Sequence, residues 1–144
     1  MPIDELKINL PEIGETITTE RALELCKHFE LDHLIERINL NPNSYKEWVF
    51  DGVSVLDDKC AAAIFNVDQE TLTLKCALPH DLRYAYGESG NKKERKDADL
   101  ILKSDLLNKA KTSNFWASIF YFAVRIGGAE FLGLSYTWAF AKKS

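Results

Sequence analysis

The sequence places a histidine and an aspartate where they could share a proton. His80 opens the segment His80-Asp81-Leu82-Arg83-Tyr84, which has helical spacing, and Asp99 borders the apolar stripe of the next helical segment. A short turn containing Gly87 joins the two segments, so the helices should run antiparallel and bring His80 against Asp99. An imidazole, with an unperturbed pKa of about 6.5, can take a proton at neutral pH, and a carboxylate on its other nitrogen fixes the tautomer. We therefore predict a hydrogen-bonded His80–Asp99 pair.

Pro79 sets the expected start of the helix that carries His80. One face repeats every fourth residue from Cys76 through His80, whereas residues 71–74 alternate as a strand does. Proline is tolerated in the first turn of a helix but not in its interior. We therefore expect a helix over about residues 77–87.

The second helix of the pair is expected over about residues 92–111, because Asn91-x-x-Glu94 has the spacing of an N-terminal cap. Its inward-facing residues should be Ala98, Ile101, Leu102, Leu106 and Ala110. Residues 115–126 are apolar nearly all round and precede Gly127-Gly128, which predicts a third helix that is buried on most sides. The antiparallel pair would form the core, with the third helix against it.

The first part of the chain, residues 1–50, is expected to form a helical arm. An amphipathic helix begins near Thr19, and the apolar pattern resumes after a break at Asp32. Ser44-x-x-Glu47 has capping-box spacing, which predicts a short helix carrying Tyr45, Trp48 and Val49. Because no linker or repeat interrupts the sequence, residues 1–144 are expected to form a single, mostly α-helical, compact domain.

Charge and hydropathy narrow the classes of function. The 144 residues carry a formal charge of −4 with acidic and basic side chains interspersed, so the basic footprint of a nucleic-acid-binding protein is missing. The N-terminus lacks a basic region followed by an apolar core, which predicts a cytoplasmic protein. Residues 115–141 are the most apolar stretch, but Arg125 and Gly127-Gly128 interrupt it, so no transmembrane segment is expected.

The cysteines give no sign of a disulfide framework or a zinc site. They are Cys26, Cys60 and Cys76, an odd number without the spacing of metal ligands. Since no export signal accompanies them, we expect reduced thiols that behave as small, mostly buried hydrophobic side chains.

Four short motifs occur in order between residues 51 and 140. They are Asp51-Gly52-Val53-Ser54, His80-Asp81-Leu82-Arg83-Tyr84, Arg95-Lys96-Asp97-Ala98-Asp99 and Val124-Arg125-Ile126-Gly127-Gly128. In these motifs the chain resembles the phospholipase A2-like superfamily, whose core is an antiparallel helix pair with His-Asp-x-x-Tyr on one helix and Asp on the other. It looks especially like compact bacterial members of uncharacterised function. The resemblance covers residues 51–140 and leaves out residues 1–50.

The resemblance implies hydrolysis of a lipid acyl ester by a His–Asp dyad, with a phospholipid or a membrane surface as the partner. His80 would be the general base that activates a water, and Asp99 the carboxylate that orients it. Tyr84 would support the pair through a hydrogen bond. These three residues are the expected catalytic set.

The resemblance also implies calcium as a cofactor, which would polarise the ester carbonyl and stabilise the developing oxyanion. Asp81 would be one ligand, and further oxygens would come from the loop residues Asp51, Gly52 and Val53. The secreted enzymes carry a Gly-x-Gly in this loop, whereas this chain has only Asp51-Gly52.

Two other functions stay open at the level of the sequence. One is a catalytically inactive helical module for binding or interaction, in which the His80–Asp99 pair is a structural tie and the protein partner is not identified. The other is an effector that acts on membranes after delivery without a signal peptide. It would use the same chemistry in another compartment.

Overall fold

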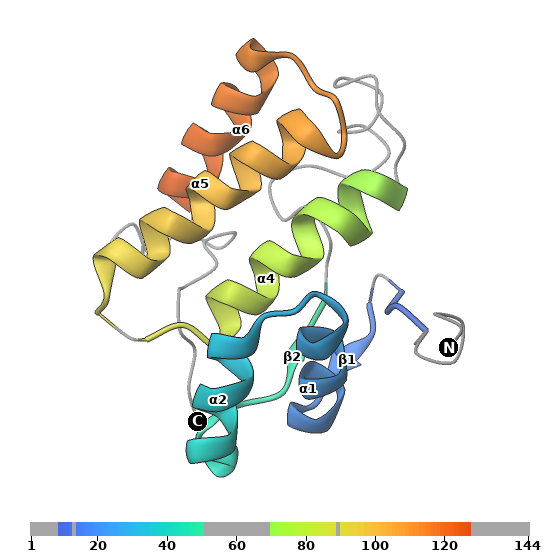
Figure 1. Cartoon of the computed structure of the whole chain (residues 1–144), viewed down its shortest axis with the longest axis vertical. Coiled ribbons are helices and arrows are strands. Elements are labelled where there is room, and N and C mark those ends of the chain that lie inside the picture. Colours follow the sequence, from blue (N-terminus) through green and yellow to red (C-terminus); the bar gives the residue numbers. More distant parts are fainter. Residues whose placement is uncertain (1–8, 13, 51–69, 89, 128–144) are drawn as a thin grey trace.

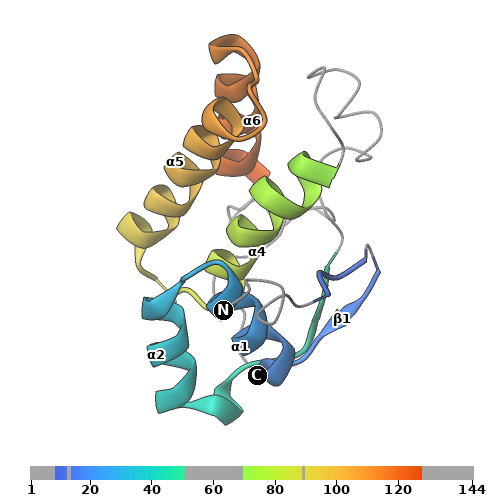
Figure 2. The ribbon, with the colours of Figure 1, turned by 45° about the vertical axis from the view of Figure 1, so that its right-hand side comes forward.

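A computed structural model of the chain describes residues 9–12, 14–50, 70–88 and 90–127. Most of these residues are helical, as predicted. The elements are β1 (Thr16–Ile17), α1 (Thr19–His28), α2 (Asp32–Leu40), β2 (Trp48–Val49), α4 (Leu78–Ala85), α5 (Lys92–Asn108) and α6 (Asn114–Gly127). In Figure 1, α5 and α6 lie at one end of the molecule and α1, α2 and the strands at the other, with α4 between them. The turned view in Figure 2 keeps this order.

The helical path that enters α4 begins earlier than the sequence predicts. A π-helix (Thr71–Ala77) runs directly into α4, and the N–H of Leu78 bonds to the carbonyl of Thr73. The α-helix itself starts at Leu78, close to the expected residue 77, but the π-helix precedes it where no helix was expected. The strand-like interpretation of residues 71–74 is therefore wrong. A proline ring clashes with the carbonyl of the preceding turn in an ordinary α-helix, and the wider π-turn gives the Pro79 ring room.

Helix α5 has the predicted cap and a slightly earlier end. The Asn91 side chain accepts a hydrogen bond from the Glu94 N–H at 2.9 Å. The helix ends at Asn108 rather than near Lys111, because Lys111 adopts the left-handed conformation (φ 59°). Of the residues expected to face inward, Ile101 is 37% exposed. The others are buried, namely Ala98, Leu102, Leu106 and Ala110.

The short helix predicted after Asn41 is replaced by extended chain. Only Pro42–Ser44 form a 3-10 turn, and Tyr45 is extended (φ −111°, ψ 140°). Strand β2 then pairs antiparallel with β1, and the Phe50 N–H bonds to the carbonyl of Glu15 at 2.9 Å. The local preference of residues 44–47 for a capped helix is weaker than this strand pairing, because the pairing provides hydrogen bonds for the backbone and buries Phe50.

Two apolar clusters support the fold, and α4 contributes to the one on the side of the N-terminal helices. Leu78 and Leu82 of α4 pack with residues of α1 and α2, among them Leu25 and Leu34. The second cluster joins the π-helix to α5 and α6, with Leu72, Cys76, Leu102, Leu106 and Ala117 among its buried members. Helix α4 therefore has one flank against the N-terminal helices, while the flank that bears His80 and Tyr84 meets α5.

Helix α6 spans the expected segment but buries one face rather than most of its surface. Ala117 and Phe120 are buried against the π-helix and α5. Phe115, Ile119 and Phe122 are 65%, 46% and 61% exposed. Within the described part of the chain, none of the helices has the length and apolarity needed to cross a membrane.

Candidate functional site

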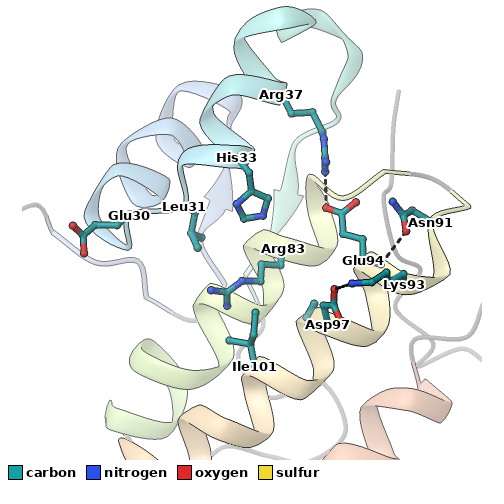
Figure 3. Close-up of a pocket in the computed structure, with 11 residues that line it drawn as sticks. Glu30, Leu31, His33, Arg37, Arg83, Asn91, Lys93, Glu94, Asp97 and Ile101 are labelled. Atoms are coloured by element: carbon teal, nitrogen blue, oxygen red, sulfur yellow. Dashed lines mark hydrogen bonds and ion pairs between the residues drawn. The ribbon is translucent and has the colours of Figure 1, made fainter.

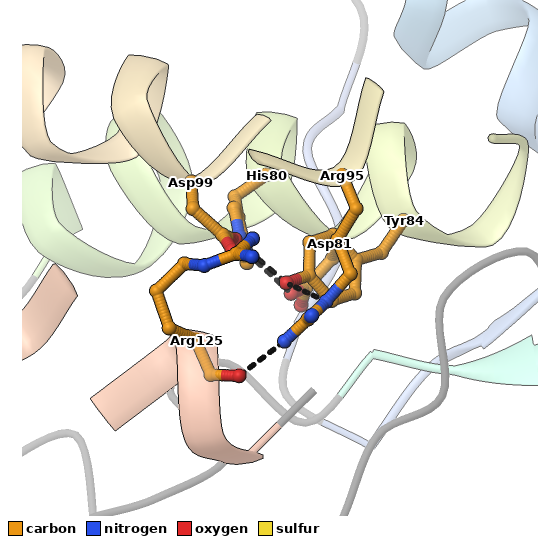
Figure 4. Close-up of polar contacts among 6 residues, drawn as sticks. All are labelled: His80, Asp81, Tyr84, Arg95, Asp99 and Arg125. Carbon is orange, nitrogen blue, oxygen red and sulfur yellow. Dashed lines mark hydrogen bonds and ion pairs between the residues drawn. The ribbon is translucent and has the colours of Figure 1, made fainter. Parts of the chain in front are cut away.

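The predicted contact between His80 and Asp99 is present. His80 Nε2 lies 2.7 Å from Asp99 Oδ1, and the Tyr84 hydroxyl donates to the same oxygen at 2.6 Å. The two residues of α4 and the carboxylate on α5 point toward one another in Figure 4. Both distances are within hydrogen-bond reach, and both are short enough for bonds to a charged acceptor.

Helix α6 supplies a further hydrogen-bond donor to the Asp99 carboxylate. Arg125, in the last turn of α6, donates from Nη1 to Asp99 Oδ2 at 2.8 Å. Asp99 itself is 0% exposed. Because a buried carboxylate is costly without partners, the contacts from His80, Tyr84 and Arg125 account for its place in the core.

Arg95 of α5 joins this polar cluster of His80, Tyr84, Asp99 and Arg125 by linking Tyr84 to Arg125. Its Nε donates to the Tyr84 hydroxyl at 3.2 Å, and its Nη2 donates to the backbone carbonyl of Arg125. Tyr84 thus contacts Arg95 while His80 contacts Asp99, so residue order is reversed between α4 and α5. These pairings confirm the antiparallel arrangement that the short connecting turn predicts.

The His80 ring has a different environment on each nitrogen. Nε2 faces Asp99, and Nδ1 lies 3.8 Å from Asp81 Oδ1, a distance that gives electrostatic attraction but not a hydrogen bond. The ring is only 5% exposed. Burial by itself lowers the pKa of His80, but the Asp81 and Asp99 carboxylates more than offset this, so the pKa stands above its usual value.

The pKa values of Asp99 and Tyr84 are also shifted, in directions that keep Asp99 ionised and Tyr84 neutral at pH 7. Burial pushes the pKa of Asp99 up, but hydrogen bonds from His80, Tyr84 and Arg125 outweigh it, so the pKa lies below the usual value. Burial, and then the charge of Asp99, raises the pKa of Tyr84. At neutral pH Asp99 is therefore ionised and Tyr84 is a neutral donor, which matches the hydrogen bonds observed.

This arrangement of side chains could take up and release a proton. When His80 is neutral and donates from Nε2 to Asp99, its Nδ1 carries the free lone pair and can accept a proton. The carboxylate then stabilises the imidazolium that forms. Tyr84 and Arg125 fix the position of the Asp99 carboxylate, and the fixed carboxylate in turn orients the His80 imidazole.

The predicted calcium ligands are only partly within the described residues. Asp81 is 7% exposed and adjoins the His80 ring, whereas Asp51, Gly52 and Val53 lie outside the described residues. Calcium takes about six to eight oxygen ligands, of which one carboxylate supplies at most two. Among the described residues, no group of acidic, histidine or cysteine side chains could hold a metal ion on its own.

Arg95 is not among the site residues predicted from the sequence, whereas in the structure it contacts Tyr84 and Arg125. The available signal was its spacing, because Arg95 precedes Asp99 by one helical repeat and so shares its face. Arg125 is likewise absent from the predicted site residues, although it lies in the fourth motif. Its partner is Asp99.

Comparisons of the chain with known protein families, with curated proteins and with solved structures gave no match. The resemblance to the phospholipase A2-like superfamily therefore rests on the four motifs and stays a hypothesis.

Proposed function

We propose that the protein hydrolyses an acyl ester of a phospholipid, with His80 as the general base. The observation that carries this proposal is the His80–Asp99 contact of 2.7 Å between antiparallel helices, with Asp81 next to the opposite ring nitrogen. The order of His80, Asp81, Tyr84 and Asp99 is also that of the motif in the superfamily that the chain resembles. Water is too weak a nucleophile at neutral pH without a positioned base.

In the proposed reaction, His80 Nδ1 takes a proton from a water as the water oxygen attacks the ester carbonyl carbon. Asp99 keeps the ring oriented through Nε2 and stabilises its positive charge. The tetrahedral intermediate then breaks the bond between the carbonyl carbon and the alcohol oxygen. The imidazolium returns the proton to the leaving alkoxide, so the products are a fatty acid and a lysophospholipid.

Tyr84 and Arg125 act as positioning residues in this scheme, because they contact Asp99 rather than the reacting atoms. Asp81 would hold calcium, and calcium when bound would polarise the ester carbonyl. The Asp81 carboxylate also favours the protonated form of His80, which helps the step in which the base accepts a proton.

A second candidate is a catalytically inactive helical module for binding or interaction. Its support is the complete burial of Asp99, together with contacts that link α4, α5 and α6 through one carboxylate. Such a tie fixes the geometry of three helices whether or not chemistry occurs. The two candidates differ in whether His80 acts on a substrate.

The deciding experiment measures fatty-acid release from phospholipid in mixed micelles, with calcium and with chelator. We expect His80→Ala to lower turnover by about 10²–10⁴-fold, the range for loss of a general base. Asp99→Asn should lower turnover less, since the base stays in place. Asp81→Asn should weaken the dependence on calcium, because an amide supplies one neutral oxygen where a carboxylate supplies two charged ones.

His28→Gln is the matched control, since His28 is exposed and stacks edge-on against Phe29, outside the cluster. It should keep full activity. Circular dichroism on each variant separates loss of chemistry from loss of fold. If wild-type protein releases no fatty acid under either condition while His80→Ala lowers the melting temperature, the hydrolase proposal fails and the module is the better account.

A further inference from the structure

A cavity of about 520 Å³ lies between α2, α4 and α5, apart from the His80–Asp99 cluster. Its wall includes Leu31, His33, Arg37, Arg83, Glu94 and Ile101, and Figure 3 shows their side chains. Neither His80 nor Asp99 lines it. Its volume is in the range of pockets that hold small organic molecules, about 300–1,000 Å³.

Most of the charges around this cavity are already neutralised by one another. Arg37 Nη1 lies 2.6 Å from Glu94 Oε2 and also donates to the backbone carbonyl of Tyr86 at 2.9 Å. Lys93 Nζ lies 2.8 Å from Asp97 Oδ2. Because the charges within each pair cancel, neither pair is expected to attract a charged ligand strongly.

Arg83 is the exception. Its side chain makes no hydrogen bond or ion pair with any residue in the described ranges, and its Nη1 is buried without a partner. Burial lowers the pKa of Arg83, although its guanidinium stays charged at neutral pH. The Asp105 carboxylate attracts the guanidinium electrostatically but makes no hydrogen bond or ion pair with it. The buried Nη1 therefore lacks the hydrogen-bond partner that a buried donor normally has among the described side chains.

The surroundings of Arg83 favour an anion with an apolar body. In Figure 3 its guanidinium lies between His33 of α2 and Ile101 of α5, while the Glu30 carboxylate points away from them. Leu31 is buried and Ile101 is 37% exposed, so apolar surface adjoins the charge. A planar guanidinium matches a phosphate or a carboxylate through paired hydrogen bonds.

We propose that this cavity is a binding site for a small amphiphilic anion, whose phosphate or carboxylate group pairs with Arg83 and whose apolar part packs on Leu31 and Ile101. The site is independent of the hydrolysis proposed for His80. His33, which faces Arg83, serves as a reporter on the same wall. Burial, and then the charges of Arg37 and Arg83, lower the pKa of His33, so a bound anion should raise it.

The experiment is an NMR titration of the full chain that follows the His33 ring protons, with hexyl phosphate, hexanoate, inorganic phosphate and hexanol as probes. We expect saturable shifts with hexyl phosphate or hexanoate and a rise in the pKa of His33. Hexanol should give none, and inorganic phosphate should bind at least tenfold more weakly than hexyl phosphate. Which of the two amphiphiles binds more tightly identifies the anionic group.

Arg83→Gln should weaken binding of the preferred probe at least tenfold, with an otherwise native amide spectrum. Arg21→Gln is the matched control, because Arg21 lies on α1 and pairs with Glu15, outside the cavity. It should bind as wild type does. Absence of saturable shifts with both amphiphiles, equal binding by Arg83→Gln, or equal affinity for inorganic phosphate and hexyl phosphate would overturn the proposal.

Discussion

Arg125 and Asp99 form an ion pair of 2.8 Å that joins the last turn of α6 to the middle of α5. The pair neutralises a carboxylate that is 0% exposed. His80 therefore need not be protonated to balance the charge of Asp99. This relationship permits the same histidine to be neutral, as a base requires, while it stays hydrogen-bonded to an ionised partner.

Replacing Arg125 with glutamine tests whether Arg125 neutralises the charge of Asp99. We expect Arg125→Gln to lower the free energy of unfolding by about 3 kcal/mol, the lower end for breaking a buried ion pair, since Arg125 is 27% exposed. The pKa of His80 should also rise, because the imidazolium becomes the main cation next to Asp99. Urea denaturation and NMR titration measure the two effects. If stability and the pKa of His80 are both unchanged, the ion pair does not balance Asp99.

The unfolding free energy should decrease as the pH rises above about 6.5. The pKa of His80 is raised in the folded state, so its contribution to stability is complete below the unfolded value and is lost as the pH passes through the folded value. His80→Gln should remove this slope. Urea titrations kept below about pH 8 avoid ionisation of the thiols. If His80 is a base, fatty-acid release should rise with pH over the same window, opposite in sign to stability.

Local sequence patterns were enough to predict the parts of the site that depend on one helix or one turn. The cap at Asn91 and the short turn before it orient α5 against α4, and the helical repeat places His80 and Asp99 at the same level. These features follow from hydrogen-bonding chemistry and periodicity within about 20 residues. The catalytic role of the pair does not follow from them and stays a prediction.

The features that were missed depend on contacts between distant segments. Strand β2 and Phe50 are extended because β1 and the adjoining Glu15, far earlier in the chain, supply their hydrogen bonds. The π-helix before Pro79 reflects packing of Leu72 and Cys76 against α5 and α6. The cavity at Arg83 exists because α2 and α5 both border α4 there. No local pattern of residue types encodes such arrangements.

The two described cysteines should resist alkylation in the native protein. Cys26 and Cys76 are both 0% exposed, and burial raises the pKa of each thiol to about 12. Thiolate is the reactive form, so native labelling with iodoacetamide should leave both peptides unmodified, whereas labelling in urea should modify both. Peptide mass spectrometry gives the comparison. Rapid native modification of either residue would show that its part of the core opens readily. Cys60 lies outside the described residues.

The two arginines of the cavity should respond in opposite directions when the charge is removed. Arg83 has a buried Nη1 without a hydrogen-bond partner among the described residues, and the attraction of Asp105 acts without a direct contact, so Arg83→Met should raise the free energy of unfolding by about 1 kcal/mol. Arg37 is paired with Glu94 and with the carbonyl of Tyr86, so Arg37→Met should lower it. Thermal and urea denaturation of both variants provide the test.

The stability of wild type and Arg83→Met should also respond differently to an amphiphilic anion. An anion that binds only the folded protein raises its melting temperature by mass action. Hexyl phosphate or hexanoate should therefore stabilise wild type and leave Arg83→Met unchanged, so that the ligand offsets the cost that the unpaired guanidinium imposes. If Arg83→Met is less stable than wild type without any ligand, Arg83 already has a stabilising partner in the native chain, and the unpaired guanidinium on which the binding site rests does not exist.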